Sequence, residues 1–98
     1  MVYFERGDKM TLLEILNSNQ LTKADKLILI YLNKIEKKRI CNVSYTKIAK
    51  DICTSKQTII TSIKKLEDKK LIDIENVLDE NNGNLTNIYK ITGGYIND

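Results

Sequence analysis

Residues 44–72 read SYTKIAKDICTSKQTIITSIKKLEDKKLI, and this stretch predicts two helices joined by a very short turn. Ser44 is the expected N-cap of the first helix, which lasts about two turns and has one apolar face. After a break at Cys53, Thr54 is the expected N-cap of the second helix, and Gln57 three residues later completes a capping box. This helix is expected to end near Lys70, and its apolar stripe consists of Ile59, Ile63 and Leu66.

Two helices joined so tightly favour a helix-turn-helix arrangement. Ala49 lies in the first helix, where a small residue lets the second helix approach closely. The second helix then projects its first turn outward. That geometry suits insertion into the major groove of DNA, because side chains near the start of the helix reach base edges there.

The sequence before this stretch predicts two further helices and a minimal strand. One helix is expected from Asp8, its N-cap, to Leu16. The next helix begins after the N-cap Thr22 and has Asp25 in its first turn, where a negative charge complements the helix dipole. It is expected to end within residues 36–39. A short strand is expected at residues 40–43.

The sequence after this stretch predicts a β-hairpin. Alternating apolar residues indicate strands at residues 71–78 and 85–91, and residues 80–84, rich in Asn and Gly, form the turn between them. Gly93 and Gly94 precede a short tail. The expected fold class is therefore mainly α with a small β-hairpin (α+β).

The length of 98 residues predicts a single domain over residues 1–98, since chains usually split only beyond about 250–300 residues. We expect an N-terminal extension with its helix at residues 1–20, a core at residues 21–91 and a tail at residues 92–98. No apolar run approaches the roughly 20 residues that a bilayer span needs, and the N-terminus lacks a signal-peptide layout. A cytoplasmic location, with no membrane partner, is therefore expected.

The residue types that the sequence lacks exclude several kinds of active site. Without histidine, histidine-based triads and metal sites are excluded, and Cys41 and Cys53 cannot complete a zinc site by themselves. No glycine-rich phosphate loop is present, and the carboxylates are interpreted as surface charges. We expect no catalytic residues, no metal, no cofactor and no enzymatic activity. The sequence shows no separate ligand domain, so no small-molecule ligand is expected.

The positive charge is concentrated in one part of the chain. Residues 22–72 contain thirteen Lys or Arg and five Asp or Glu, a net charge of +8, whereas the remaining residues sum to −5 and bring the total to +3. Such an uneven field favours a polyanionic partner, although solvated helix faces in a Lys-rich chain explain the same pattern.

The pattern of capped helices, apolar positions and hairpin resembles the winged helix-turn-helix domains of bacterial plasmid and phage replication initiators and, more distantly, MarR-type regulators. The residues that carry the resemblance lie between Ser44 and Ile72, and it covers roughly residues 21–91. It departs from the family at Cys53 and Lys70, where such domains often place glycine. Both positions are expected to need left-handed backbone.

The resemblance implies sequence-specific binding of double-stranded DNA by a recognition helix at about residues 54–69, in a transcriptional regulator or a replication-associated factor. Gln57 is a candidate for reading adenine, and Lys56 and Lys64 for meeting guanine or phosphate. Ile60 contacts a thymine methyl group in one interpretation and packs against a neighbouring element in the other. The remaining candidates for DNA contact are Lys47, Ser55, Thr58, Thr61 and Lys65 on the helices, and Asn81, Asn82 and Asn84 at the wing tip.

Two further expectations concern protein partners. The hairpin carries Asp73, Glu75, Asp79 and Glu80, which would repel DNA, so a protein-interaction module without DNA binding is the alternative function. The helix at residues 8–16 has more apolar surface than one core face needs. We favour a homodimer formed through this helix; otherwise the helix simply covers the core.

Overall fold

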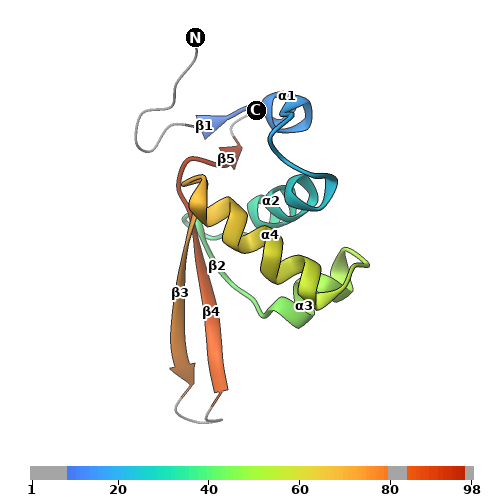
Figure 1. Ribbon diagram of the computed structural model, residues 1–98. Helices are drawn as coiled ribbons and strands as arrows, with labels where there is room; N and C mark the ends of the chain where they lie inside the picture. The colour runs from blue at the N-terminus through green and yellow to red at the C-terminus, as the bar shows by residue number, and fades with distance from the viewer. Residues whose placement is uncertain (1–8, 80–83, 97–98) are drawn as a thin grey trace.

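Four helices and a three-stranded antiparallel sheet account for most of residues 9–79 and 84–96, which are the residues that the computed structural model describes (Figure 1). The helices are α1 (Leu12–Asn17), α2 (Lys23–Ile35), α3 (Tyr45–Asp51) and α4 (Lys56–Asp68). The strands are β1 (Lys9–Met10), β2 (Ile40–Asn42), β3 (Ile72–Asp79), β4 (Asn84–Ile91) and β5 (Tyr95–Ile96). The expected α+β class and the expected hairpin are confirmed.

The helix caps agree with the sequence in two cases and differ in two. Thr22 caps α2 in a reciprocal capping box with Asp25, and Ser44 caps α3. Ser55, and not Thr54, caps α4, because the Thr54 N–H donates to the carbonyl of Ala49 and belongs to the turn. The predicted helix from Asp8 to Leu16 is also wrong at its start.

Helix α1 begins at Leu12 and has Thr11 as its N-cap, in a capping box with Glu14. The residues before it, Lys9 and Met10, form strand β1, and Asp8 lies outside the described residues. The capping box satisfies backbone donors that an earlier helix start would leave to a single carboxylate. The predicted N-cap of this helix, Asp8, is therefore three residues too early.

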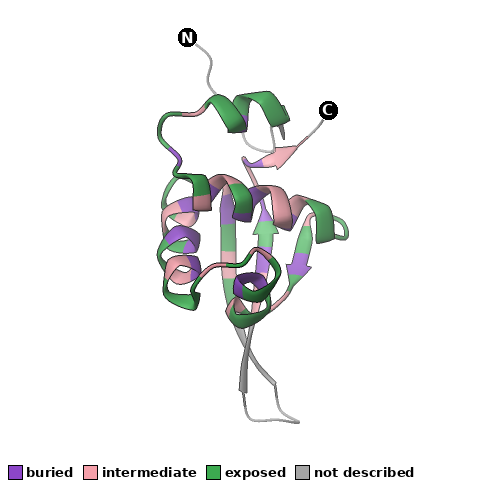
Figure 2. Cartoon of the chain, turned by 90° about the vertical axis from the view of Figure 1, so that its right-hand side faces the viewer, coloured by how far each residue is buried: buried purple, intermediate pink, exposed green. Residues whose placement is uncertain are grey.

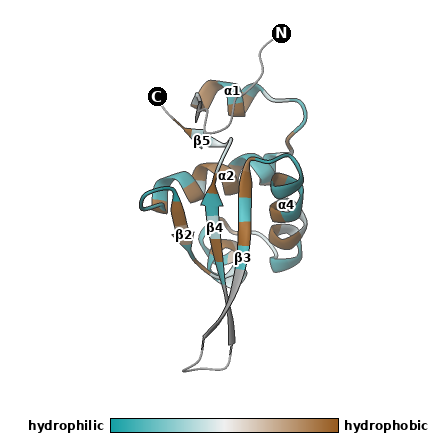
Figure 3. Cartoon of the chain, turned by 90° about the vertical axis from the view of Figure 1, so that its left-hand side faces the viewer, coloured by the Kyte–Doolittle hydropathy of each residue, from teal (hydrophilic) through white to brown (hydrophobic). Residues whose placement is uncertain are grey.

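The main sheet has the strand order β2-β4-β3, and every neighbour is antiparallel. Tyr89 and Ile91 of β4 are buried on the face that the helices cover, whereas Lys90 between them points to the opposite, exposed face. Hydrophobic and hydrophilic positions alternate in the same way along β3 (Figure 3). The hairpin of β3 and β4 extends away from the helices, and its turn at residues 80–83 lies outside the described residues (Figure 1).

A second, two-stranded sheet of β1 and β5 was not predicted. The two strands pair in parallel, with Lys9 opposite Tyr95 and Met10 opposite Ile96. Asn33 of α2 holds β5 in place: its amide donates to the carbonyls of Leu29 and Gly94, and its oxygen accepts from the Ile96 N–H at 2.8 Å. Gly94 fits against α2 because a Cβ there would lie only 2.8 Å from Leu29. The predicted tail at residues 92–98 therefore includes a strand.

One apolar core joins α1, the three longer helices and the sheet. Its fully buried side chains include Ile15 from α1, Leu29 from α2, Ile63 from α4 and Tyr89 from β4. Each fully buried side chain of this size contributes roughly 1.5–3 kcal/mol through the hydrophobic effect. Both cysteines are free thiols, Cys41 in the core and Cys53 at the surface. Burial raises the pKa of the Cys41 thiol to about 11, and the charge of Glu36 adds to this effect.

Candidate nucleic-acid interface

The turn between α3 and α4 is fixed by backbone hydrogen bonds at the end of α3. The Thr54 N–H donates to Ala49 at 2.9 Å, and the Cys53 N–H donates to Lys50 at 3.4 Å, which together form a Schellman motif. Cys53 has a φ of 57°, so the predicted left-handed backbone at this position is confirmed. Ala49 is buried, as expected for a small residue of α3 where this helix packs against α4. The chain therefore leaves α3 abruptly and enters α4 after only a few residues.

The end of α4 repeats the same motif. The Leu71 N–H donates to Leu66 at 3.0 Å, the Lys70 N–H donates to Glu67 at 2.9 Å, and Lys70 has a φ of 61°. The second predicted left-handed position is thus confirmed as well. Helix α4 is bounded at both ends by tight turns, which fix where it starts and where the chain enters β3.

Helix α4 has one buried face and one exposed face (Figure 2). Ile59, Ser62, Ile63 and Leu66 are buried. Exposed positions follow at helical spacing on the other side, and they are Lys56, Gln57, Thr61 and Lys64. Thr58, Ile60 and Lys65 are half-buried at the borders of this face. The structure therefore brings most of the predicted contact residues together on one surface, which we call the α4 surface (Lys56, Gln57, Ile60, Thr61 and Lys64).

The hydroxyl groups at the start of α4 are partly used within the helix. Ser55 Oγ accepts from the Thr58 N–H at 3.1 Å and lies 2.8 Å from Thr58 Oγ1, so one hydroxyl donates to the other. Two hydroxyls have two hydrogens between them, and this contact uses one. The other hydrogen is left to donate to an acceptor such as a phosphate oxygen. One turn further along, the Gln57 side-chain amide approaches Thr61 Oγ1 at 3.4 Å.

Lys47 is on the exposed side of α3, as predicted, and forms an ion pair within the helix. Its Nζ lies 3.1 Å from Asp51 Oδ1, and 59% of its side chain is exposed. An exposed ion pair between residues one helical turn apart contributes little to stability, so Lys47 is able to leave Asp51 and bind another anion. Lys50 is exposed on the same short helix.

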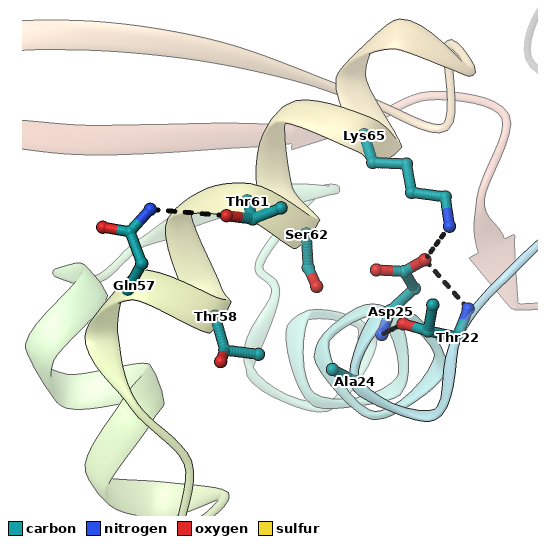
Figure 4. Close-up of a pocket in the computed structure, with 8 residues that line it drawn as sticks. All are labelled: Thr22, Ala24, Asp25, Gln57, Thr58, Thr61, Ser62 and Lys65. Atoms are coloured by element: carbon teal, nitrogen blue, oxygen red, sulfur yellow. Dashed lines mark hydrogen bonds and ion pairs between the residues drawn. The ribbon is translucent and has the colours of Figure 1, made fainter.

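Lys65 has a partner that the sequence did not reveal. Its Nζ lies 3.0 Å from Asp25 Oδ2, and this carboxylate is only 1% exposed (Figure 4). The same oxygen accepts from the Thr22 N–H at 2.9 Å. Burial alone would raise the pKa of Asp25, but hydrogen bonds from Thr22, Ser62 and Lys65 and the charge of Lys65 outweigh it and hold the pKa below its usual value.

A cavity of about 330 Å³ opens between the start of α2 and this side of α4. Most of the surface that lines it is apolar, although all the lining residues except Ala24 carry a hydroxyl, amide or ionic group. They are Thr22, Ala24, Asp25, Gln57, Thr58, Thr61, Ser62 and Lys65 (Figure 4). The cavity therefore adjoins the α4 surface.

The described part of the hairpin carries more negative than positive charge near its base. Asp73 and Glu75 are exposed, and Asp73 lies opposite the exposed Lys90 in the strand register. Asn81 and Asn82 lie outside the described residues, and Asn84 is the first residue of β4. The structure therefore places no described lysine or arginine in the wing beyond Lys90.

A family model described as a helix-turn-helix domain matches residues 19–72, which is more than half of the chain. The chain belongs to this helix-turn-helix family. The match begins just before α2 and ends at the first residue of β3. It therefore includes both helices of the helix-turn-helix unit, α3 and α4, and the helix α2 that packs against them. Domains of this kind bind DNA through such a unit.

The helix-turn-helix chain is also similar to a solved structure described as a possible transcriptional regulator from Methanosarcina mazei Go1. The two share 26% sequence identity with a TM-score of 0.58, and the alignment covers 82% of this chain and 62% of the other. The chain thus spans less than two thirds of that protein's length. No curated protein sequence matches the chain.

Two other features of the helix-turn-helix chain bear on its chemistry. No helix within the described residues is both long and apolar enough to cross a membrane. Within the same residues, no three His, Cys, Asp or Glu side chains come together where they could hold a metal ion.

Proposed function

We propose that the chain binds double-stranded DNA sequence-specifically, with α4 as the recognition helix, and that it acts as a non-enzymatic transcriptional regulator. The observation that carries this proposal is the exposed α4 surface on a helix held by a tight turn after α3. A rigid helix with an uncovered face of amide, hydroxyl and ammonium groups suits the donors and acceptors of the major groove. The similarity to a possible transcriptional regulator supports the regulatory role over a role in replication.

Individual roles follow from the chemistry of each side chain. Gln57 is exposed in the first turn of α4, where its amide is able to form two hydrogen bonds with adenine. Lys64 is exposed on the same face and is assigned to a phosphate, and Lys56 to a phosphate or a guanine. Ile60 is half-buried but is not among the described apolar side chains that pack on the core. This favours its contact with a thymine methyl group.

The remaining assignments concern the backbone of the DNA. Thr61 is exposed beside Gln57, and Lys47 projects from α3, so both are assigned to phosphate oxygens. The pair Ser55 and Thr58 supplies one further hydroxyl donor. Lys65 contributes less than Lys64, because Asp25 already neutralises its charge. The wing tip, Asn81, Asn82 and Asn84, is assigned at most a secondary contact.

Selection from a random duplex library, followed by titration of the winning duplex at several salt concentrations, tests the proposal. Lys64→Ala should weaken binding to all sequences similarly and make the slope of log K against log salt shallower by about 1. Lys90→Ala is the matched control. It removes the same charge from the face of the sheet that points away from the helices, and it should leave the slope unchanged. Gln57→Ala should instead relax the preference at one base pair by about 1–3 kcal/mol.

The alternative function, a winged-helix interaction module without DNA binding, is favoured by the exposed Asp73 and Glu75 of the wing. It predicts that no duplex binds even at low salt, where contacts to phosphate are strongest. Absence of binding at low salt would contradict the proposed function and leave this alternative.

We also propose that two copies associate through α1 and that residues 1–98 act as one domain, with residues 1–20 extending a core at residues 21–91. Only Ile15 of α1 is buried, whereas Leu13 and Leu16 are 65% and 47% exposed. Helix α1 lies at the end of the molecule opposite the hairpin, so pairing there leaves α4 free (Figure 1). Sedimentation equilibrium should show a dimer that Leu13→Glu dissociates and that the control Ile40→Glu, on the outer face of β2, does not.

A further inference from the structure

We infer that Asp25 is a positioning residue that fixes the rotation of α4 about its own axis and thereby the direction in which the α4 surface faces. The inference rests on the proposed function, because this direction matters for base recognition only if α4 reads DNA. Asp25 itself is buried and has no access to a nucleotide. It acts through the α4 side chain that it holds by an ion pair, Lys65.

The contacts of Asp25 join the start of α2 to one side of α4. The Asp25 carboxylate receives the Thr22 N–H at 2.9 Å, which ties it to its own helix cap, and Lys65 Nζ at 3.0 Å. The buried Ser62 side chain lies near the carboxylate and helps to lower its pKa. Ser62 and Lys65 are three residues apart and therefore lie one above the other on the same side of the helix. Asp25 thus holds α4 through the ion pair with Lys65 drawn in Figure 4, and Ser62 lies one turn earlier on the same side of the helix.

The apolar contacts of α4 do not by themselves define its rotation so narrowly. Ile59, Ile63 and Leu66 bury the inner face, but the hydrophobic effect has no directional preference. A rotation of α4 by about 20° would move side-chain ends at a radius of roughly 5–6 Å by about 2 Å. Hydrogen bonds to base edges tolerate only about 0.5 Å of variation in length. A directional polar contact is therefore needed for side chains such as Gln57 to meet bases reproducibly.

The ion pair is better suited to specifying geometry than to raising stability. Removing a carboxylate from water is costly, and attraction to a lysine often does no more than offset that cost. Lys65 keeps 38% of its side chain exposed, so the pair lies at the rim of the core and beside the cavity that adjoins the α4 surface. An ion pair in this place chiefly determines how the two helices fit together.

Asp25→Asn tests the inference, because it keeps the shape and an acceptor for the Thr22 N–H but removes the charge that holds Lys65. Asp68→Asn is the matched control, since it makes the same chemical change at an exposed carboxylate of α4. In the wild type and both variants, residual dipolar couplings measure the orientation of α4 relative to α2 in the free protein. Affinities for the selected duplex and for a duplex with one changed base pair measure discrimination.

We expect Asp25→Asn to alter the orientation of α4 and to reduce discrimination by roughly tenfold, within the range of one lost base contact. Asp68→Asn should change neither. Lys65→Arg, which keeps a charged donor for Asp25, should retain discrimination, whereas Lys65→Met should lose it. Ser62→Ala removes a single donor and provides a milder variant if Asp25→Asn fails to fold.

Unchanged α4 orientation and unchanged discrimination in Asp25→Asn and in Ser62→Ala would overturn the inference. An equal loss of affinity for both duplexes that follows a loss of stability, with discrimination unchanged, would also overturn it, because a merely structural role predicts that result. If the wild type binds no duplex, the proposed function fails. The dipolar couplings of the free protein then still decide whether Asp25 sets the orientation of α4.

Discussion

The phenol of Tyr31 on α2 donates a 2.5 Å hydrogen bond to Asp51 Oδ2 on α3. The same carboxylate receives Lys47 Nζ at 3.1 Å through its other oxygen. These hydrogen bonds, from Tyr31 above all, hold the pKa of Asp51 below its usual value. Tyr31 therefore connects α2 to the first helix of the helix-turn-helix unit, whereas Asp25 connects α2 to the second.

Tyr31 should ionise only in strongly alkaline solution. Burial, followed by the hydrogen bond and charge of Asp51, raises its pKa from 10.0 to about 12. Between these two values the unfolded chain loses a proton that the folded chain keeps, so this contribution to stability is lost as pH rises from 10 towards 12. Tyrosinate absorbance should show that Tyr31→Phe removes one group titrating near pH 12. An unchanged titration curve would contradict this assignment.

Lys70→Gly should stabilise the fold. Lys70 has a φ of 61°, a conformation in which a Cβ is strained and which glycine adopts freely. After subtraction of the greater freedom of glycine in the unfolded chain, we expect a gain of about 0.5–1 kcal/mol in the free energy of unfolding, measured by urea denaturation.

Lys69→Gly is the control for this substitution. Lys69 has the same side chain and a φ of −84°, so glycine relieves no strain there. It brings its entropic cost and removes the exposed hydrogen bond from Lys69 Nζ to Gln20 Oε1, and stability should fall. A loss of stability in both variants would show that the left-handed residue is not strained.

Asn33→Ala should release the C-terminal strand. Its side chain makes three hydrogen bonds, two of them to the backbone of Gly94 and Ile96, and β5 in turn pairs with β1. Partly buried backbone groups left without partners should lower the free energy of unfolding by about 1–3 kcal/mol. The amide hydrogen of Ile96 should exchange faster with solvent. The exposed Asn42→Ala should change neither measurement appreciably.

Local signals explain which parts of the fold could be predicted. The caps at Thr22 and Ser44 and the left-handed backbone at Cys53 and Lys70 depend on neighbouring residues, and the structure confirms all four. The cap of α4 was misplaced because Thr54 and Ser55 are both good caps. The structure shows that Ser55 is the cap, because the Thr54 N–H donates to the Ala49 carbonyl at the end of α3 and Thr54 therefore belongs to the turn.

Contacts between distant residues explain what the sequence did not predict. The two-residue strands β1 and β5 exist because residues 9–10 and 95–96 meet and because Asn33 holds β5, and no local sequence pattern predicts such a pairing. Counting positions around α4 assigned Lys65 to DNA, but its ion pair is with Asp25, forty residues earlier. Asp25 was correctly placed in the first turn of α2, yet its burial depends on where α4 packs.

Asp25 should also make the fold sensitive to acid. Its folded pKa lies below the ordinary value of 3.8, because the hydrogen bonds and the charge of Lys65 outweigh the opposing effect of burial. As pH falls, the unfolded chain binds a proton at Asp25 before the folded chain does. The contribution of Asp25 to stability is therefore complete well above pH 3.8 and is lost as pH falls through the lower pKa of the folded state. Urea denaturation at a series of pH values should show this decline in the wild type and a shallower one in Asp25→Asn. Asp68→Asn should decline as the wild type does, and an equally steep decline in Asp25→Asn would mean that other carboxylates account for the acid sensitivity.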